Sequence, residues 1–337
     1  MKKTTIKDIA HRLEVSPSTI SRALSNHPDI SEALKIKIKE VAQAMKYRPS
    51  AAALHLKRGS NKTIALIIPQ ITSFFYPSVI HGIEAVLHSQ GYTLMILPTN
   101  DSLEREEENI GIAYDHDVAG VLIALTKETV NLDHFQTLKD SNIPVVLIDK
   151  VIEGTPYSSI TIDDYKVSYQ MVQHLYKTGC QKIIGIFGKA SLTISHLRYR
   201  GFAQALADLN LPHETSQIAF VNSSSEAYTI ALDMIQHHHP DGLYVMTDEI
   251  MLGVMPAIAE LDLKVPEQIS VLAISDGHLA QFMIPTVSHM KHDGLELGSL
   301  SAQKIIQYIN AKNNNLLWNT PERIQMNTNI VFLNSTK

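Results

Sequence analysis

Short apolar runs alternate with helix-length stretches through most of this chain, and this alternation restricts the fold more than any other feature. Helical segments such as Ser78–Ser89 and Asp164–Tyr176 separate most of the runs. Nine runs are rich in β-forming residues: Thr63–Ile68, Thr93–Leu97, Gly120–Ala124, Pro144–Ile148, Ser159–Ile162, Lys182–Phe187, Ile218–Val221, Gly242–Met246 and Ser270–Ile274. Strands that alternate with helices form parallel sheets through right-handed crossovers. The sequence therefore predicts an α/β body from residue 62 onward.

Polar side chains follow several of these runs. Ser73 comes after the first run, Asp149 after the fourth, Asp248 after the eighth and Asp276 after the ninth. Arg198, just before a helical segment, completes the set. Ligands of parallel sheets bind outside the carboxyl ends of the strands. A single aspartate there is equally typical of an Asx-type cap, so only the shared position favours a binding site.

The amino-terminal segment differs from the body in charge. Residues 1–60 carry twelve Lys and Arg against five Asp and Glu, whereas the rest of the chain carries 17 basic and 29 acidic residues. A basic head on an acidic body indicates a polyanion-binding module, although a solvated lysine-rich helix would give the same count.

The basic head has the pattern of a helix-turn-helix. Thr5 and Asp8 have the spacing of a capping box, Ser16-Pro17 is typical of a second helix start, and Ser31 of a third. Apolar residues recur behind these caps at helical spacing: Ile6, Ile9, Ala10, Leu13, Ile20, Ala23, Leu24, Leu34, Ile38, Val41 and Met45. Three short helices with a tight first turn fit this motif.

The second helix presents the side chains Ser18, Thr19, Ser21 and Arg22 on its exposed face. Short hydroxyl groups near a helix start can contact bases and phosphates in a major groove, and an arginine can bond guanine through two hydrogen bonds. The alternative is an ordinary capped surface helix. The charge, the spacing of the turn and the arginine together favour DNA binding.

The segment after the third helix predicts a linker that can become helical. Pro49 ends the third helix, Ser50 can cap an Ala-rich helix, and Gly59 can end it. Because helices this short are marginal in water, we expect it to form only when a partner holds it. The alternative is a plain interdomain linker. We accordingly divide the chain into a DNA-binding domain at 1–48, a hinge at 49–61 and a body at 62–337.

In these motifs the chain resembles the LacI/GalR family of bacterial transcription regulators. The head carries the resemblance in IKDIA (6–10), VSPSTISRAL (15–24) and YRPSAAALHL (47–56). The body adds shorter matches in the expected order: GCQKII (179–184), RYRGF (198–202), TDEIMLG (247–253) and VPEQISV (265–271). The resemblance implies an all-α head and a body of two periplasmic-binding-protein-like lobes. The first lobe would comprise roughly 62–160 plus 291–319, and the second 163–288 plus 322–333.

The resemblance also implies which residues contact DNA. Leu56 would be an apolar wedge in the minor groove with Lys57 beside it, kinking the duplex. The predicted major-groove and phosphate contacts are Ser16, Pro17, Ser18, Thr19, Ser21 and Arg22, to which we add Ser31 and Tyr47. Two departures stand out. Glu14 occupies a turn position where the family usually has glycine, and Pro17 offers no side-chain hydrogen bond.

The same resemblance implies a small-molecule effector between the lobes. Asp248 and Arg198 match positions that hold effector hydroxyls in sugar-responsive members, and aromatic residues such as Phe75 and Tyr76 can stack on a sugar. The predicted effector contacts are Ser73, Phe75, Tyr76, Asp149, Arg198, Asp248 and Asp276. Ile274-Ser275-Asp276 departs from the family pattern, so the identity of the effector does not transfer.

Several classes of protein are excluded. The chain has no P-loop, GxSxG or GxGxxG motif, so we expect no enzyme and no cofactor. The triplet His237–His239 is not spaced for a metal and is typical of a surface helix end, and Glu104–Glu108 of a solvated helix face. With one cysteine, no apolar leader and no membrane-length apolar run, the composition indicates a cytoplasmic protein with no membrane association.

The resulting prediction is a homodimeric, sequence-specific transcriptional regulator, most simply a repressor of carbohydrate-related genes. It would bind a near-palindromic site in double-stranded DNA under the control of a sugar or sugar derivative. Two alternatives remain: a sugar-binding protein of the transport type, and a sugar-metabolising enzyme without DNA function. The basic head disfavours the first, and the lack of a catalytic base paired with a cofactor site disfavours the second.

Overall fold

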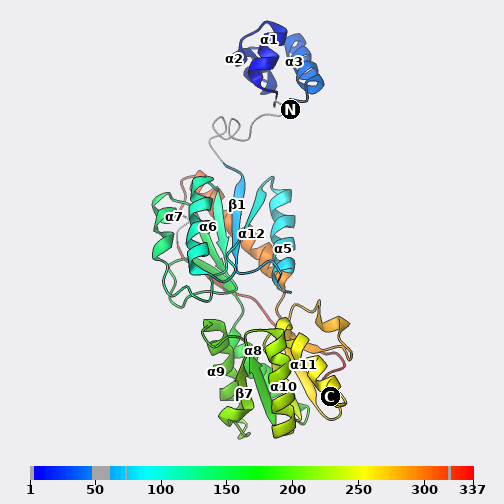
Figure 1. Cartoon of the computed structure of the whole chain (residues 1–337). Helices are drawn as coiled ribbons and strands as arrows, with labels where there is room; N and C mark the ends of the chain where they lie inside the picture. Colours follow the sequence, from blue (N-terminus) through cyan, green and yellow to red (C-terminus); the bar gives the residue numbers. More distant parts are fainter. Residues whose placement is uncertain (1–3, 48–60, 73, 318–319) are drawn as a thin grey trace. The chain divides into compact units, whose positions relative to one another are not determined.

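The computed structural model describes residues 4–47, 61–72, 74–317 and 320–337. The chain divides into two compact units, Met1–Asn61 and Lys62–Lys337, each with a core of its own (Figure 1). The predicted hinge helix, with Leu56 and Lys57, lies outside the described residues, as does Ser73.

The first unit contains three helices, α1 (Ile6–Leu13), α2 (Pro17–Leu24) and α3 (Glu32–Ala44). The predicted capping box is present at α1, and the Ser16 side chain accepts a hydrogen bond from the Thr19 amide at α2. Ser31 occupies the N-cap position of α3 but makes no capping hydrogen bond with its side chain. The core consists of Ile9, Ala10, Ile20, Ala23, Ile38 and Ala42. This arrangement is the predicted helix-turn-helix.

Glu14 ends α1 in the left-handed conformation, with φ 54° and ψ 38°. Its amide donates to the carbonyl oxygen of Ala10, which closes the helix. Because this backbone conformation favours glycine, the presence of glutamate at this position strains the backbone locally.

The second unit contains two sheets, as the two predicted lobes require, but each has six strands, so the sheets comprise three strands beyond the nine predicted. Sheet A has the order β11-β5-β4-β3-β1-β2 and is parallel throughout. Its strands are β1 (Thr63–Ile68), β2 (Thr93–Pro98), β3 (Gly120–Ile123), β4 (Val145–Ile148), β5 (Ser158–Thr161) and β11 (Arg323–Gln325). Its helices are α5 (Tyr76–Ser89), α6 (Leu103–Asp115), α7 (Gln136–Asp140) and α12 (Gly294–Asn313), with a 3-10 turn at Asp133–Phe135.

Sheet B has the order β12-β10-β9-β8-β6-β7 and is parallel except where β12 pairs with β10. Its strands are β6 (Ile183–Phe187), β7 (Ile218–Phe220), β8 (Gly242–Val245), β9 (Ser270–Ser275), β10 (Ser288–Lys291) and β12 (Ile330–Val331). Its helices are α8 (Asp164–Lys177), α9 (Thr193–Asp208), α10 (Ser224–His238) and α11 (Asp248–Glu260), with 3-10 turns at Thr215–Gln217 and Ala280–Phe282.

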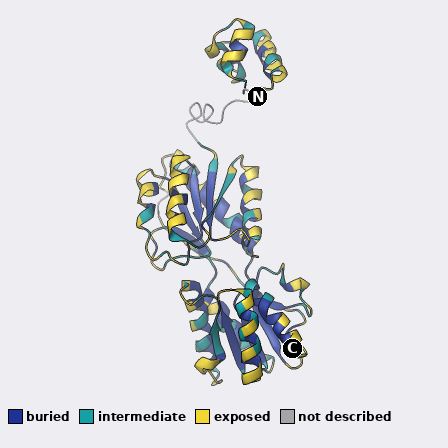
Figure 2. Ribbon diagram, viewed as in Figure 1, coloured by how far each residue is buried: buried dark blue, intermediate teal, exposed yellow. Residues whose placement is uncertain are grey.

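The central strands are buried on both faces because helices cover both sides of each sheet (Figure 2). All five residues of Ile64–Ile68 are fully buried, as are most of β3, β4, β8 and β9. This burial explains why these strands are continuous apolar runs and do not alternate with polar residues. The helix pair α5 and α12 packs at glycine positions, and a Cβ at Gly298 would overlap the carbonyl oxygen of Val79.

The chain passes between the two lobes after β5, after β10 and after β11. The last crossing differs from the prediction. Residues 322–333 were assigned to the second lobe, but Arg323–Gln325 pairs with β5 in sheet A, so the chain crosses between β11 and β12. Three-residue edge strands of mixed polarity carry too weak a pattern to be found from the sequence.

Two smaller predictions have different outcomes. Glu106 is fully buried, so the prediction of a solvated face at Glu104–Glu108 was wrong for this residue. Its carboxylate accepts from the amide of Thr126 at 2.7 Å and lies 2.8 Å from the ring of His134. The triplet His237–His239, in contrast, ends α10 as predicted, with His239 in the left-handed conformation.

Candidate functional site

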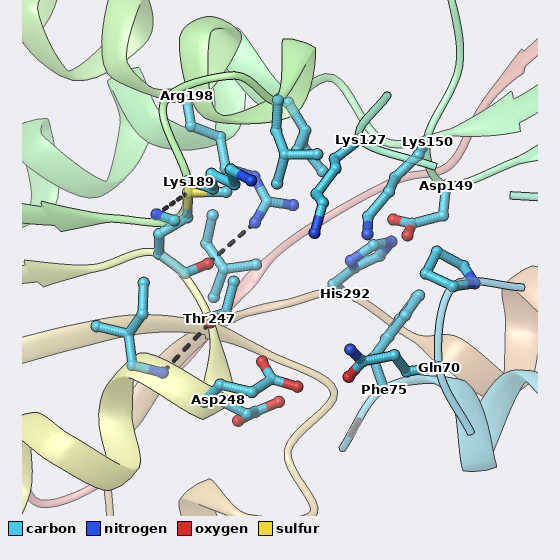
Figure 3. Close-up of a pocket in the computed structure, with 18 of the residues that line it drawn as sticks. Gln70, Phe75, Lys127, Asp149, Lys150, Lys189, Arg198, Thr247, Asp248 and His292 are labelled. Atoms are coloured by element: carbon cyan, nitrogen blue, oxygen red, sulfur yellow. Dashed lines mark hydrogen bonds between the residues drawn. The ribbon is translucent and has the colours of Figure 1, made fainter. Parts of the chain in front are cut away.

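A cavity of about 390 Å³ lies between the two lobes at the carboxyl ends of their strands (Figure 3). Residues that follow β1, β4, β6, β8 and β9 line it, so both sheets contribute. This is the position at which parallel sheets bind ligands, and the volume is typical of a small-molecule site. Six of the seven predicted effector contacts line the cavity: Phe75, Tyr76, Asp149, Arg198, Asp248 and Asp276.

Arg198 is held by two hydrogen bonds. Its Nε atom donates to Asp164 at 2.8 Å, and one terminal nitrogen donates to the carbonyl oxygen of Met246 at 2.9 Å. It lies within α9, not before a helix as predicted, and its side chain is only 3% exposed. Burial raises the pKa of Asp164 to about 6, against the opposing effect of Arg198. A guanidinium fixed on one side retains further N–H donors that a ligand in the cavity can use.

Asp248 begins α11, whose N-cap residue Thr247 accepts a hydrogen bond from the Ile250 amide. Its side chain accepts from the Ser275 hydroxyl at 2.6 Å and is 5% exposed. Burial raises the pKa of Asp248 to about 7; the bond from Ser275 opposes the shift and the nearby charge of Asp276 adds to it. A buried carboxyl group at the cavity wall can accept hydrogen bonds from ligand hydroxyl groups.

Two further carboxylates reach the cavity from different lobes. Asp149, after β4, accepts from the hydroxyl of Tyr76 at 2.9 Å. Asp276, after β9, accepts from the hydroxyl of Ser78 at 2.6 Å. Because Ser78 is on α5 of the first lobe and Asp276 belongs to the second, this hydrogen bond connects the lobes directly.

The sequence reasoning missed several cavity residues, of which His292 is the most buried titratable one. Its ring stacks on Phe75 with centroids 4.2 Å apart, and it is 5% exposed. Its Nε2 atom has no hydrogen-bond partner among the residues that the structure describes. Burial lowers the pKa of His292 to about 4, so the ring is neutral at physiological pH. His292 directly follows β10, so the strand-end rule would have found it if the sequence had predicted that strand.

Several other missed polar residues follow predicted strands, so the strand-end rule could have found them. They include Gln70 after β1, Asp101 after β2, Lys127 after β3, Lys150 after β4, Lys189 after β6 and Asn222 after β7.

The second candidate site is α2 of the first unit. Ser18 and Arg22 are exposed, and the side chain of Arg22 is 58% exposed with a terminal nitrogen 3.9 Å from Asp29. The Ser16 hydroxyl caps the helix by accepting from the Thr19 amide, and the hydroxyl of Thr19 lies 2.9 Å from it. The remaining assigned positions differ in exposure: Pro17 and Ser31 are exposed, whereas Ser21 and Tyr47 are half-buried.

Other kinds of site were sought in the same residues. Within the described ranges, no group of three or more His, Cys, Asp and Glu side chains is placed to hold a metal ion. Nor is any described helix both long and apolar enough to cross a membrane.

A helix-turn-helix unit and a two-lobed body with a cavity at its strand ends are together typical of DNA-binding transcription regulators. Comparison with known proteins agrees with this class. Residues 5–50 match the model "Bacterial regulatory proteins, lacI family", and residues 172–335 match "Periplasmic binding protein-like domain". The chain thus has a LacI-family helix-turn-helix domain and a periplasmic-binding-protein-like domain, the combination found in LacI-type DNA-binding transcriptional regulators, which are not enzymes.

Individual relatives extend over nearly the whole chain. It is 25% identical to Catabolite control protein A of Priestia megaterium, with 99% of each chain covered. It is also 25% identical to the Ribose operon repressor of Halalkalibacterium halodurans, over 92% of this chain and 91% of that one. The structure of the lac repressor dimer bound to operator and the anti-inducer ONPF superimposes with a TM-score of 0.86, 20% identity and 99% coverage of both chains, which shows that the fold is shared.

Proposed function

We propose that a sugar or sugar derivative binds in the cavity between the lobes and controls the affinity of this repressor for its operator. The observation that carries the proposal is the cavity itself, where carboxyl groups, a fixed guanidinium and an aromatic stack meet at the ends of both sheets.

The chemistry of the cavity suits a polyhydroxylated ligand. Asp149 and Asp248 can accept hydrogen bonds from hydroxyl groups, and Arg198 can donate to hydroxyl or ring oxygens. Phe75, stacked on His292, presents an aromatic surface for the apolar face of a sugar ring. One relative is named Ribose operon repressor and others are named HTH-type transcriptional repressor PurR, so the choice of a sugar rests on the chemistry of the cavity and not on the names of the relatives.

The proposed DNA contacts start from the two exposed polar groups of α2. Ser18 and Arg22 would read bases, while Ser16 and Thr19 would fix the start of the helix at the phosphates. We assign Leu56 and Lys57 to the minor groove on the family resemblance alone. The lac repressor dimer supports a homodimer whose two heads occupy the halves of a near-palindromic site.

Effector and DNA would be coupled through the hinge at 49–61. If closure of the lobes around a sugar changes how the two hinges of a dimer meet, then the sugar alters the affinity for DNA, and DNA alters the affinity for the sugar by the same factor. This reciprocity holds whether the effector releases the operator or promotes its binding.

The experiment first selects an operator from genomic fragments with the purified full chain. Fluorescence anisotropy then measures operator affinity with and without pentoses, hexoses and disaccharides. We expect at least one sugar to change the affinity five-fold or more, and Asp248→Asn to abolish this response while retaining operator binding. Asp262→Asn, at an exposed position, is the matched control. If no sugar alters operator affinity, or if Asp248→Asn responds like the parent protein, the proposal is wrong.

A further inference from the structure

We infer that Asp276 is a positioning residue: from the second lobe, its carboxylate holds the start of α5 on the first lobe. The start of α5 carries Phe75 and Tyr76, two aromatic side chains of the cavity wall. The inference goes beyond the proposed function, because it assigns Asp276 to the joint between the lobes and needs no ligand.

The start of α5 is not capped by its own N-cap residue. That residue is Phe75, which makes no capping hydrogen bond with its side chain, and Pro77 in the first turn has no amide hydrogen. The helices α6 and α12 of the same lobe are capped locally, by Ser102 and Asp293. Because the first amide groups of a helix lack intrahelical partners and carry a partial positive charge, this end of α5 favours a negative group from elsewhere.

Two carboxylates of the second lobe lie at this end of α5. Asp276 accepts from the hydroxyl of Ser78, in the first turn, at 2.6 Å. Glu249 accepts from the amide of Phe74, just before the helix, at 3.3 Å. The two acids follow β9 and β8, which are neighbouring strands of sheet B. We call these four residues the interlobe clamp, since both of its hydrogen bonds join one lobe to the other.

Asp276 is oriented for this contact by its own lobe. One carboxylate oxygen accepts from the His278 amide at 2.9 Å, while the other oxygen accepts from Ser78. The turn is tightened by the Ser275 hydroxyl, which accepts from the Gly277 amide at 2.9 Å. The φ of Gly277 is 95°, a conformation that favours glycine. The side chain of Asp276 therefore fixes its own turn and reaches the first lobe at the same time.

The charges at these strand ends give a second argument for the clamp. Burial raises the pKa of Asp248, and the nearby charges of Asp276 and Glu249 raise it further, so three acidic side chains lie close together. Like charges at this spacing repel one another. The positive end of α5 and the donor groups of Phe74 and Ser78 offset this repulsion from the side of the first lobe.

The interlobe clamp acts on the cavity through the first turn of α5. Phe75 stacks on His292 at the cavity wall (Figure 3). The start of α12, just after the crossing from β10, packs against the same turn, because a Cβ at Gly294 would lie 2.9 Å from the Cβ of Ser78. A rotation of the lobes would separate Asp276 from Ser78 and loosen the turn that carries Phe75.

Hydrogen–deuterium exchange of the full chain, read by mass spectrometry, tests the inference without a sugar or an operator. Its outcome is therefore separate from that of the proposed function. The key variant is Asp276→Ser, whose hydroxyl can still accept from the His278 amide but is too short to reach Ser78. We expect peptides covering residues 74–82 to exchange at least about three-fold faster. The first turn of α6, which has its own cap at Ser102, should not change.

A second variant tests the same contact from the first lobe. Ser78→Ala should speed exchange at the start of α5 and also in the turn at residues 276–279 of the second lobe. The double variant should exchange no faster than the faster single variant, because both substitutions remove one hydrogen bond. Asp276→Asn keeps an acceptor but loses the charge, so its exchange should lie between the parent and Asp276→Ser. Asp262→Asn, at an exposed position of the second lobe, is the matched control and should leave α5 unchanged.

A purely local role for Asp276 gives a different pattern. If Asp276→Ser speeds exchange only in its own turn and leaves α5 at the parent rate, the inference is wrong. Additive effects of Asp276→Ser and Ser78→Ala would also overturn it, since the two residues would then act independently. Faster exchange throughout both lobes, α6 included, would show a general loss of stability and would equally refute a positioning role. If Asp276→Ser does not fold, the reciprocal effect of Ser78→Ala on residues 276–279 decides the question.

Discussion

Replacing Asp248 by asparagine should raise the free energy of unfolding of the body above that of the parent protein, and this gain should be larger at pH 8 than at pH 5. Asp248 is 5% exposed, and burial raises its pKa to about 7, from an ordinary value near 4. Asparagine has nearly the same shape, keeps an oxygen that can accept from Ser275, and cannot ionise. The variant therefore removes the cost of a buried charge without removing the hydrogen bond.

The sign follows from the protons bound in each state. Between about pH 4 and pH 7 the unfolded state has lost the proton of Asp248 and the folded state retains it, so the free energy of unfolding falls as the pH rises. Each pH unit in this window removes about 1.4 kcal/mol, so about 3 kcal/mol is lost between pH 5 and pH 8. His292 has the opposite sign because its folded pKa, about 4, is depressed, but it is present in both proteins and cancels in the comparison.

The measurement is urea unfolding of the parent chain and of Asp248→Asn at pH 5, 6, 7 and 8, followed by a spectroscopic signal of the body. The stability difference in favour of asparagine should grow with pH and level off above pH 7. Asp262→Asn, at an exposed position whose φ of 52° asparagine accepts, should give a difference that does not change with pH. A constant difference for Asp248→Asn from pH 5 to pH 8 would refute the reasoning.

Three other predictions test the head and the helix packing. Arg22→Ala should reduce discrimination by roughly 1–3 kcal/mol at one base pair of the selected operator, and equal weakening on every sequence would contradict its role as a base reader. Glu14→Gly should stabilise the left-handed end of α1 by about 1 kcal/mol, seen as slower amide hydrogen exchange in α1 and α2 of the full chain. Gly298→Ala should lower the free energy of unfolding of the body by about 1–3 kcal/mol, measured in urea, because its Cβ would overlap the Val79 carbonyl oxygen. Gly111→Ala, in open space on α6, is the control and should raise this free energy by up to about 1 kcal/mol.

The sequence predicted those parts of the fold that have strong local patterns. The nine predicted runs are all strands of the two sheets. The central ones are apolar because parallel strands buried on both faces must be, whereas the edge strands β2 and β7 are only half-buried. The caps of α1 and α2 were readable because their hydrogen bonds join residues three positions apart, as in Thr5 with Asp8 and Ser16 with Thr19. The strand-end rule brought Asp149 and Asp248 to one cavity although nearly a hundred residues separate them.

The parts that were missed depend on contacts distant in the sequence. β11 is defined by its pairing with β5, more than 150 residues earlier, and its own three residues are too few to form a recognisable pattern. Glu106 is buried because Thr126 and His134 come to meet it from a later loop, while its neighbours in the acidic run remain exposed. His292 follows β10, a short strand with polar residues that gave no apolar run to extend. No local window contains the partner that decides these cases.

The free-energy cost of a buried charge in the cavity affects both the stability of the folded chain and its affinity for a ligand. Asp248 is held where water is largely excluded, and its ionised carboxyl group costs free energy in the unliganded protein. A substitution that removes this charge should therefore stabilise the folded chain while it weakens effector binding, which is the usual opposition between stability and function at a binding site. A ligand that bonds this carboxyl group binds only the folded state, so it should raise the melting temperature, and the stabilisation should grow with the logarithm of its concentration divided by its Kd. An additive that binds outside the cavity would keep its stabilising effect in Asp248→Asn, whereas an effector would lose it.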